Sequence, residues 1–277
     1  MNEQPSGLQD DVAAARRIPR NRGWDSTERA GCGVSTSSTG GARLPASLRL
    51  GEYVDIVSTT LPMFPLNAVI FPGVSVPLNV FEDRYRALVH HLLRVEDPTQ
   101  RLFGSVGIRE GYEVGDHGSQ SLFRVGCRVQ LTEVEPRPDG TFSIVAVGLE
   151  RIQLERLDTS GAFPVGQVVD RPETAGAVPE ELLERARETF TAYRAALAEI
   201  RHDPYTGDLP QDPSYLSWTL AACAPLPLHE RQALLEAEDA GHRLRMVTDL
   251  LRSELRAINA LPSLPATDVA RTRWSPN

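Results

Sequence analysis

Two long stretches of alternating apolar and polar residues, joined by a tight-turn sequence, constrain the fold of this chain more than any other feature. They are SLFRVGCRVQLTEVEP (Ser121–Pro136) and FSIVAVGLERIQLERL (Phe142–Leu157). Such alternation is typical of strands with one buried face. Between them, RPDG (Arg137–Gly140) contains the Asp-Gly pair that favours a tight hairpin turn. The sequence therefore predicts a long antiparallel hairpin.

Shorter strand patterns surround this hairpin from Leu61 to about Pro172. We expect strands in VSVPLNVF (Val74–Phe81), RLFGSVGIRE (Arg101–Glu110) and FPVGQVVDRPE (Phe163–Glu173). The segment EDRYRALVHHLLRV predicts a helix whose apolar face carries Phe81, Tyr85, Leu88, Val89, Leu92 and Leu93. Several strands, one helix and glycines that tolerate twist predict a small curved sheet or pseudo-barrel.

The segment LPMFPLNAVIFPG (Leu61–Gly73) is strongly apolar, yet it contains three prolines. Proline is tolerated in edge strands and not in central ladders. We therefore expect an entering edge strand that bends around the mouth of the barrel. Its apolar side chains are expected to pack under the Phe81–Val95 helix; they are Phe64, Leu66, Val69 and Phe71.

The chain becomes helical after Ala175. Heptad spacing predicts a helix from Pro179 to Ile200, with an apolar seam at Leu183, Ala186, Phe190, Tyr193, Leu197 and Ile200. Asp212 is a predicted N-cap, and two further helices follow. The fold class is thus α+β: a β pseudo-barrel followed by a C-terminal helical bundle. We divide the chain into an extension of low complexity (1–57), a β-rich subdomain (58–175), a helical subdomain (176–262) and a tail (263–277).

Composition excludes several classes of protein. The net charge of −8 disfavours a general nucleic-acid binder, which needs a basic face. The N-terminus lacks the apolar core of a signal peptide, and no stretch is long and apolar enough for a membrane helix, so we expect a cytoplasmic protein. All 29 basic residues are arginine. Without lysine there is no Walker A motif, no Ser–Lys dyad and no Schiff base.

The sequence shows no pattern typical of a catalytic, cofactor or metal site. The three cysteines are far apart and form no CxxC pair, and His90 and His91 are adjacent and cannot chelate one ion from a helix. His117 follows Asp116 in the polar segment 111–120, but no GxSxG nucleophile motif accompanies it. We expect no cofactor, no bound metal and no enzymatic activity, which favours a binding module.

The segment LPMFPLNAVIFPGVSVPLNVFEDRYRALV (Leu61–Val89) closely resembles the opening of the N-terminal, substrate-binding domain of the Lon protease family. Asn79 stands where that family commonly has histidine. The resemblance continues to about Leu261 and implies a PUA-like β pseudo-barrel followed by a helical bundle. Because the chain ends at Asn277 and lacks lysine, we expect a free-standing protein of this type, without the ATPase and protease domains of Lon.

The resemblance implies a non-enzymatic polypeptide-binding or adaptor module linked to protein quality control or proteolysis. Its expected partners are unfolded or tagged polypeptides; a separate protease and the oligomeric state stay open. Candidate binding residues are Tyr112, His117 and Phe123, because an aromatic side chain beside a polar loop suits capture of a polypeptide. An alternative is an RNA or small-ligand reader, in which arginines line one face of the barrel: Arg101, Arg109, Arg124 and Arg128.

Overall fold

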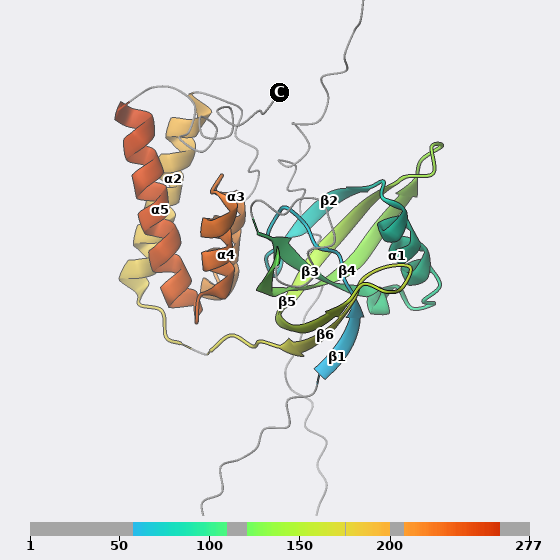
Figure 1. Cartoon of the computed structure of the whole chain (residues 1–277). Coiled ribbons are helices and arrows are strands. Elements are labelled where there is room, and N and C mark those ends of the chain that lie inside the picture. The colour runs from blue at the N-terminus through green and yellow to red at the C-terminus, as the bar shows by residue number, and fades with distance from the viewer. Residues whose placement is uncertain (1–57, 110–120, 175, 200–207, 261–277) are drawn as a thin grey trace, which may run out of the picture. The chain divides into compact units, whose positions relative to one another are not determined.

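The strands form one six-stranded antiparallel sheet (Figure 1). The computed structural model describes residues 58–109, 121–174, 176–199 and 208–260, which all belong to one compact unit. The strand order is β1-β6-β5-β4-β3, and β2 pairs separately with β5. The strands are β1 (Ser58–Pro62), β2 (Ser75–Val80), β3 (Leu102–Ile108), β4 (Leu122–Pro136), β5 (Phe142–Asp158) and β6 (Val165–Asp170).

The proline-containing segment after β1 connects the two ends of this strand order. Met63 and Leu66 form parallel bridges with Gly104 and Gly107 of β3. The Phe64 amide donates to the Gly104 carbonyl at 2.8 Å. Since β1 pairs with β6 and the residues directly after it pair with β3, the sheet closes into a barrel. The expected bend of an entering strand around the barrel is confirmed.

The long hairpin is confirmed in β4 and β5, whose register ends at the pair Pro136↔Phe142. Gly140 has a φ of 80°, a conformation that glycine adopts without a steric penalty, and its amide donates to the Arg137 carbonyl. Two register shifts interrupt the β4–β5 ladder, between Cys127 and Val129 and between Leu131 and Glu133. Bulges of this kind increase strand bending and twist, which a closed sheet requires.

Helix α1 (Asp83–Leu93) packs on the barrel, and the 3₁₀ turn η1 (Pro98–Gln100) follows it. Tyr85 of α1 stacks on Phe64 with ring centroids 4.2 Å apart. The predicted apolar face was wrong at its two ends, because Phe81 is 66% exposed and Leu93 is 38% exposed. Phe81 precedes the first helical turn and therefore does not share the helical phase, and Leu93 is the last helical residue.

The apolar side chains of the segment before β2 pack into two different clusters, whereas the prediction placed them in one. Phe64 belongs to the barrel cluster that includes residues of α1, and Leu66 packs against that cluster. Val69 and Phe71 instead belong to the cluster of the helical region, where Phe71 lies 5.8 Å from Trp218 between ring centroids. The expectation that all four side chains pack under α1 was therefore wrong for Val69 and Phe71.

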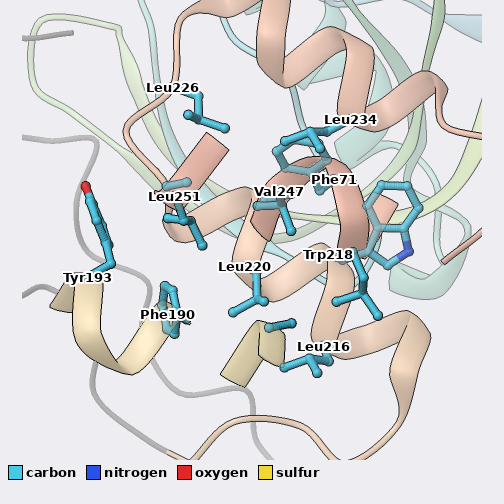
Figure 2. Packing of buried hydrophobic residues seen from close by; sticks show 14 of the residues in the cluster. Phe71, Phe190, Tyr193, Leu216, Trp218, Leu220, Leu226, Leu234, Val247 and Leu251 are labelled. Atoms are coloured by element: carbon cyan, nitrogen blue, oxygen red, sulfur yellow. The ribbon is translucent and has the colours of Figure 1, made fainter. Parts of the chain in front are cut away.

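In the described part of the chain, four helices follow the strands and share one apolar core, part of which Figure 2 shows. They are α2 (Glu180–Ala198), α3 (Pro213–Cys223), α4 (Leu228–Glu236) and α5 (Ala240–Ala260). The heptad positions of α2 from Leu183 to Leu197 are buried, and α2 packs along α5. Asp212 caps α3 by accepting from the Tyr215 amide at 3.0 Å, as predicted.

Candidate functional site

Of the three predicted binding residues, the structure describes only Phe123. Tyr112 and His117 lie within 110–120, outside the described residues. Phe123 is the second residue of β4 and is partly buried. The Arg109 amide donates to the Ser121 carbonyl at 2.7 Å, which holds the end of β3 beside the start of β4. Phe123 therefore lies at the end of the β3–β4 ladder that the 110–120 segment connects.

The Phe123 ring lies close to a glycine and to a guanidinium. A Cβ atom at Gly107 would lie 2.9 Å from Phe123 Cδ2, so the absence of a side chain there makes room for the ring. The Arg109 guanidinium carbon lies 5.6 Å from the ring centroid, within the range of a cation–π contact. Arg109 is itself exposed. A partly buried aromatic ring and an exposed cation therefore lie next to each other at the end of the β3–β4 ladder.

Helix α4 contributes a buried polar side chain to the same region. Gln232 is 2% exposed, and its Nε2 donates to the Val125 carbonyl of β4 at 3.0 Å. Its Oε1 would lie 3.5 Å from a Cβ at Gly107. Phe123 thus lies where the start of β4 contacts α4. Sequence reasoning missed Gln232, although its position four residues after Leu228 and three before Leu235 places it on the inward face of α4.

Two arginines connect the barrel to α4, and the sequence interpretation assigned no role to either. Arg151 of β5 is 4% exposed and donates from Nη1 to the Leu235 carbonyl at 3.1 Å and to the Ala237 carbonyl. Arg231 of α4 lies over the Phe71 ring, 4.9 Å from its centroid. Burial lowers the pKa of Arg151. Carbonyl groups at the end of a helix carry partial negative charge, which favours a cation there. Arg151 lies near other polar residues of its strand pattern, such as Glu150 and Gln153, so no local pattern indicated its burial.

Three of the four arginines proposed for the RNA alternative make hydrogen bonds or ion pairs with other described residues. Arg128 pairs with Glu150 at 3.1 Å and with Asp170 at 2.6 Å. Arg124 Nη1 donates to the Leu154 and Glu155 carbonyls at 3.1 and 2.9 Å, and Arg101 Nε donates to the Val95 carbonyl. These contacts orient three of the four guanidiniums toward the protein, which disfavours a shared phosphate-binding face.

Cys127 is buried in β4, and burial raises the pKa of its thiol to about 12. The thiolate is the reactive species, so we expect iodoacetamide at pH 8 to leave Cys127 unmodified in the folded protein and to alkylate it in urea. Peptide mass mapping checks this expectation, and rapid alkylation of Cys127 in the folded protein would contradict it.

The raised pKa of the Cys127 thiol also makes the stability of the fold depend on pH. Because this pKa is higher in the folded than in the unfolded protein, the contribution of the thiol to the free energy of unfolding is complete below pH 9 and declines as the pH rises toward 12.

Within residues 58–109, 121–174, 176–199 and 208–260, no group of three His, Cys, Asp or Glu side chains is arranged to hold a metal ion. Every helix in those ranges is too short or too polar to cross a bilayer. The described candidate site consists of partly buried Phe123 and exposed Arg109, with buried Gly107 and Gln232 of α4 next to Phe123.

Comparison with known proteins gives consistent matches. A family model described as the ATP-dependent protease La (LON) substrate-binding domain matches residues 60–253. The Lon protease of Elusimicrobium minutum is 28% identical over 222 residues, covering 75% of this chain and 26% of that protein. The Lon protease of Escherichia coli K12 is 26% identical over 199 residues, covering 70% and 25%. The chain spans about a quarter of the length of these relatives.

Two solved structures share the fold. The crystal structure of a Lon N-terminal domain protein from Xanthomonas campestris has a TM-score of 0.52 at 25% identity and covers 69% of this chain and 98% of that one. The N-terminal domain of a Mycobacterium avium complex Lon protease has a TM-score of 0.51 at 19% identity, covering 70% and 98%, a likeness of fold alone. The chain belongs to the family of the ATP-dependent protease La (LON) substrate-binding domain.

Proposed function

We propose that this chain is a non-enzymatic polypeptide-binding or adaptor module that serves protein quality control or proteolysis. Its family supports a polypeptide ligand, since the matched family model is that of a substrate-binding domain. The expected ligands are unfolded or tagged polypeptides, with a separate protease as a further partner. We also retain the division into a β-rich subdomain up to residue 175 and a helical subdomain after it as part of this proposal.

The observation that carries the proposal is the Phe123 ring with Arg109 over it. An aromatic edge provides apolar contact area without demanding one particular side chain, and a guanidinium can bind either a carbonyl or a carboxylate. Such a surface suits ligands of varied sequence. Tyr112 and His117, which lie outside the described residues, stay candidate binding residues on the basis of the sequence alone.

Substitution of Phe123 tests the proposal. We expect Phe123→Ala to weaken binding of fluorescein-labelled, reduced and carboxymethylated lactalbumin about 5- to 30-fold, which corresponds to about 1–2 kcal/mol for an aromatic contact. Phe123→Leu, which keeps an apolar side chain, should lose less affinity. Fluorescence anisotropy measures the binding, and thermal unfolding of each variant identifies any loss of fold.

Two results would contradict this assignment. Equal affinity of the wild type and a folded Phe123→Ala variant would remove Phe123 from the site. Failure of the wild type to bind any unfolded polypeptide, together with salt-sensitive binding of single-stranded RNA, would favour the alternative reader function.

A further inference from the structure

The side-chain carboxamide of Gln232 has one paired end and one unpaired end. Its Nε2 donates to the Val125 carbonyl at 3.0 Å and to Glu236 Oε1 at 2.7 Å. Both partners are acceptors, so the nitrogen must lie on their side and the oxygen on the other side. Gln232 Oε1 is buried and accepts no hydrogen bond from any residue that the structure describes. Buried polar atoms are nearly always paired, so an unpaired oxygen indicates a missing donor.

The unpaired oxygen lies next to the Phe123 ring, beside Gly107. A Cβ atom at Gly107 would lie 3.5 Å from Gln232 Oε1 and 2.9 Å from Phe123 Cδ2. Both groups therefore border the space that a side chain at this position would occupy. Gln232 is 2% exposed, whereas Phe123 is only partly buried. Of the two, the ring is the group that solvent or a ligand meets first.

Phe123 lies in a bulge, where β4 is not paired in register with β3 or β5. The β3–β4 register shifts between Val106 and Ile108, so Phe123 has no partner in β3. The register of β4 with β5 begins only at Val125. Bulges re-aim side chains and are frequent next to functional sites. Turning of the Phe123 ring away from Gly107 would therefore leave both ladders of β4 intact.

We propose that Gln232 Oε1 is a hydrogen-bond acceptor of the polypeptide site and that its donor is a backbone amide of the ligand. In the bound state the Phe123 ring turns away from Gly107 and contacts the apolar side chain of the ligand residue that donates. Every apolar residue except proline joins an N–H group to an apolar side chain in this way. This inference rests on the proposed function, because its ligand is the polypeptide assigned there.

The chemistry around the oxygen favours a neutral donor. Burying a cation costs more than burying an amide, and the Arg109 guanidinium carbon already lies 5.6 Å from the centroid of the Phe123 ring. Glu236 is at the other end of the carboxamide, where it accepts from Nε2. Folded proteins pair nearly all of their buried backbone amides internally, whereas the amides of an unfolded chain are available. An acceptor at this position therefore selects apolar segments that are unfolded.

Two variants of Gln232 separate the role of its oxygen from that of its nitrogen. Gln232→Met has a similar size but provides neither the donor nor the acceptor. Gln232→Glu keeps an acceptor oxygen and, when ionised, loses the donor to the Val125 carbonyl. If Gln232 served only to hold Val125 through Nε2, the two variants would therefore behave alike. Thermal unfolding of both variants identifies any loss of fold.

The probe is a fluorescein-labelled peptide of serine, leucine and phenylalanine, prepared also in versions that each carry one N-methylated backbone amide. N-methylation removes a single N–H donor and keeps every side chain. We expect one of these versions to bind the wild type about 5-fold more weakly than the parent peptide, as the loss of one hydrogen bond predicts. The same N-methyl group should weaken binding to Gln232→Met by less than about 2-fold, and to Gln232→Glu by about 5-fold or more, because a charged acceptor bonds more strongly. Fluorescence anisotropy measures these affinities.

The outcomes separate this inference from the proposed function. Equal binding of the parent and all N-methylated peptides by the wild type would overturn the inference, and this test does not depend on the folding of either variant. Equal sensitivity of Gln232→Met and Gln232→Glu to N-methylation would assign Gln232 a structural role alone. In both cases, lactalbumin binding by the wild type and its loss in Phe123→Ala would still support the proposed function. If the wild type binds lactalbumin but not the parent peptide, this inference is wrong, and if it binds neither, both proposals are wrong.

Discussion

Replacing Arg243 with alanine is expected to lower the free energy of unfolding by about 3–5 kcal/mol, as for other buried ion pairs that lose one partner. The Arg243 side chain is fully buried, forms an ion pair with Glu173 and donates from Nε to Ser217 Oγ at 2.9 Å. Its guanidinium carbon lies 3.1 Å from the centroid of the Trp218 ring. Burial lowers the pKa of Arg243, and the Glu173 carboxylate opposes that shift. Alanine would leave Glu173 without its cation and a cavity beside Trp218.

Arg252 on the same helix provides the matched control. Its side chain is 43% exposed, and its distance to Asp249 is 3.9 Å. Arg252→Ala should therefore change stability by at most about 0.5 kcal/mol, as exposed ion pairs do. Urea denaturation followed by circular dichroism measures both variants. If Arg243→Ala and Arg252→Ala had equal effects, the buried ion pair would not stabilise the fold.

The position of Glu173 connects this ion pair to the region of the Phe123 site. Glu173 lies in the connection between β6 and α2, and it also accepts from Ser214 Oγ of α3 at 2.8 Å. It therefore joins that connection to α3 and, through Arg243, to α5. Arg151 and Gln232 join β5 and β4 to α4 in the same region. We expect loss of these contacts to disturb the start of β4, where Phe123 lies.

The elements that were predicted correctly are those whose patterns are local in the sequence. The β4–β5 hairpin follows from alternation and an Asp-Gly turn, and α2 follows from its heptad spacing. Phe81 was predicted on the apolar face of α1, but it precedes that helix. An error of one or two residues in the predicted start of a helix is enough to assign a side chain to the wrong element. Such boundaries depend on the capping geometry, which the composition of the segment does not determine.

The buried arginines could not be predicted from local patterns. Arg151 is stabilised by carbonyls 84 and 86 residues further along the chain, and Gln232 by a carbonyl 107 residues away. A buried cation is favourable only where acceptors surround it, and those acceptors exist only after the fold forms. The same applies to Phe123, whose aromatic character is visible in the sequence while its contacts with Gly107 and Arg109 arise from the pairing of β3 and β4.

Gly148→Ala and Gly126→Ala are expected to destabilise the barrel by about 2–3 kcal/mol each, in the range of overpacked cores. A Cβ at Gly148 would lie 2.2 Å from the Phe71 carbonyl oxygen, and one at Gly126 would lie 2.1 Å from the Ser105 carbonyl oxygen. Both contacts are with backbone, which cannot rotate away as a flexible side chain can. The strands themselves would have to separate.

Gly161→Ala is the matched control, because it makes the same substitution at a position where the added methyl group has room. Gly161 is exposed, and a Cβ there would lie 3.6 Å from its nearest neighbour, the Phe163 carbonyl oxygen. We expect Gly161→Ala to be neutral or to stabilise by up to about 1 kcal/mol, because alanine restricts the unfolded chain. Thermal and urea unfolding compare the three variants. In the structure the Gly73 amide donates to the Gly148 carbonyl at 2.8 Å, so the Phe71–Gly73 segment lies directly against β5. Equal stability of Gly148→Ala and Gly161→Ala would contradict this close contact.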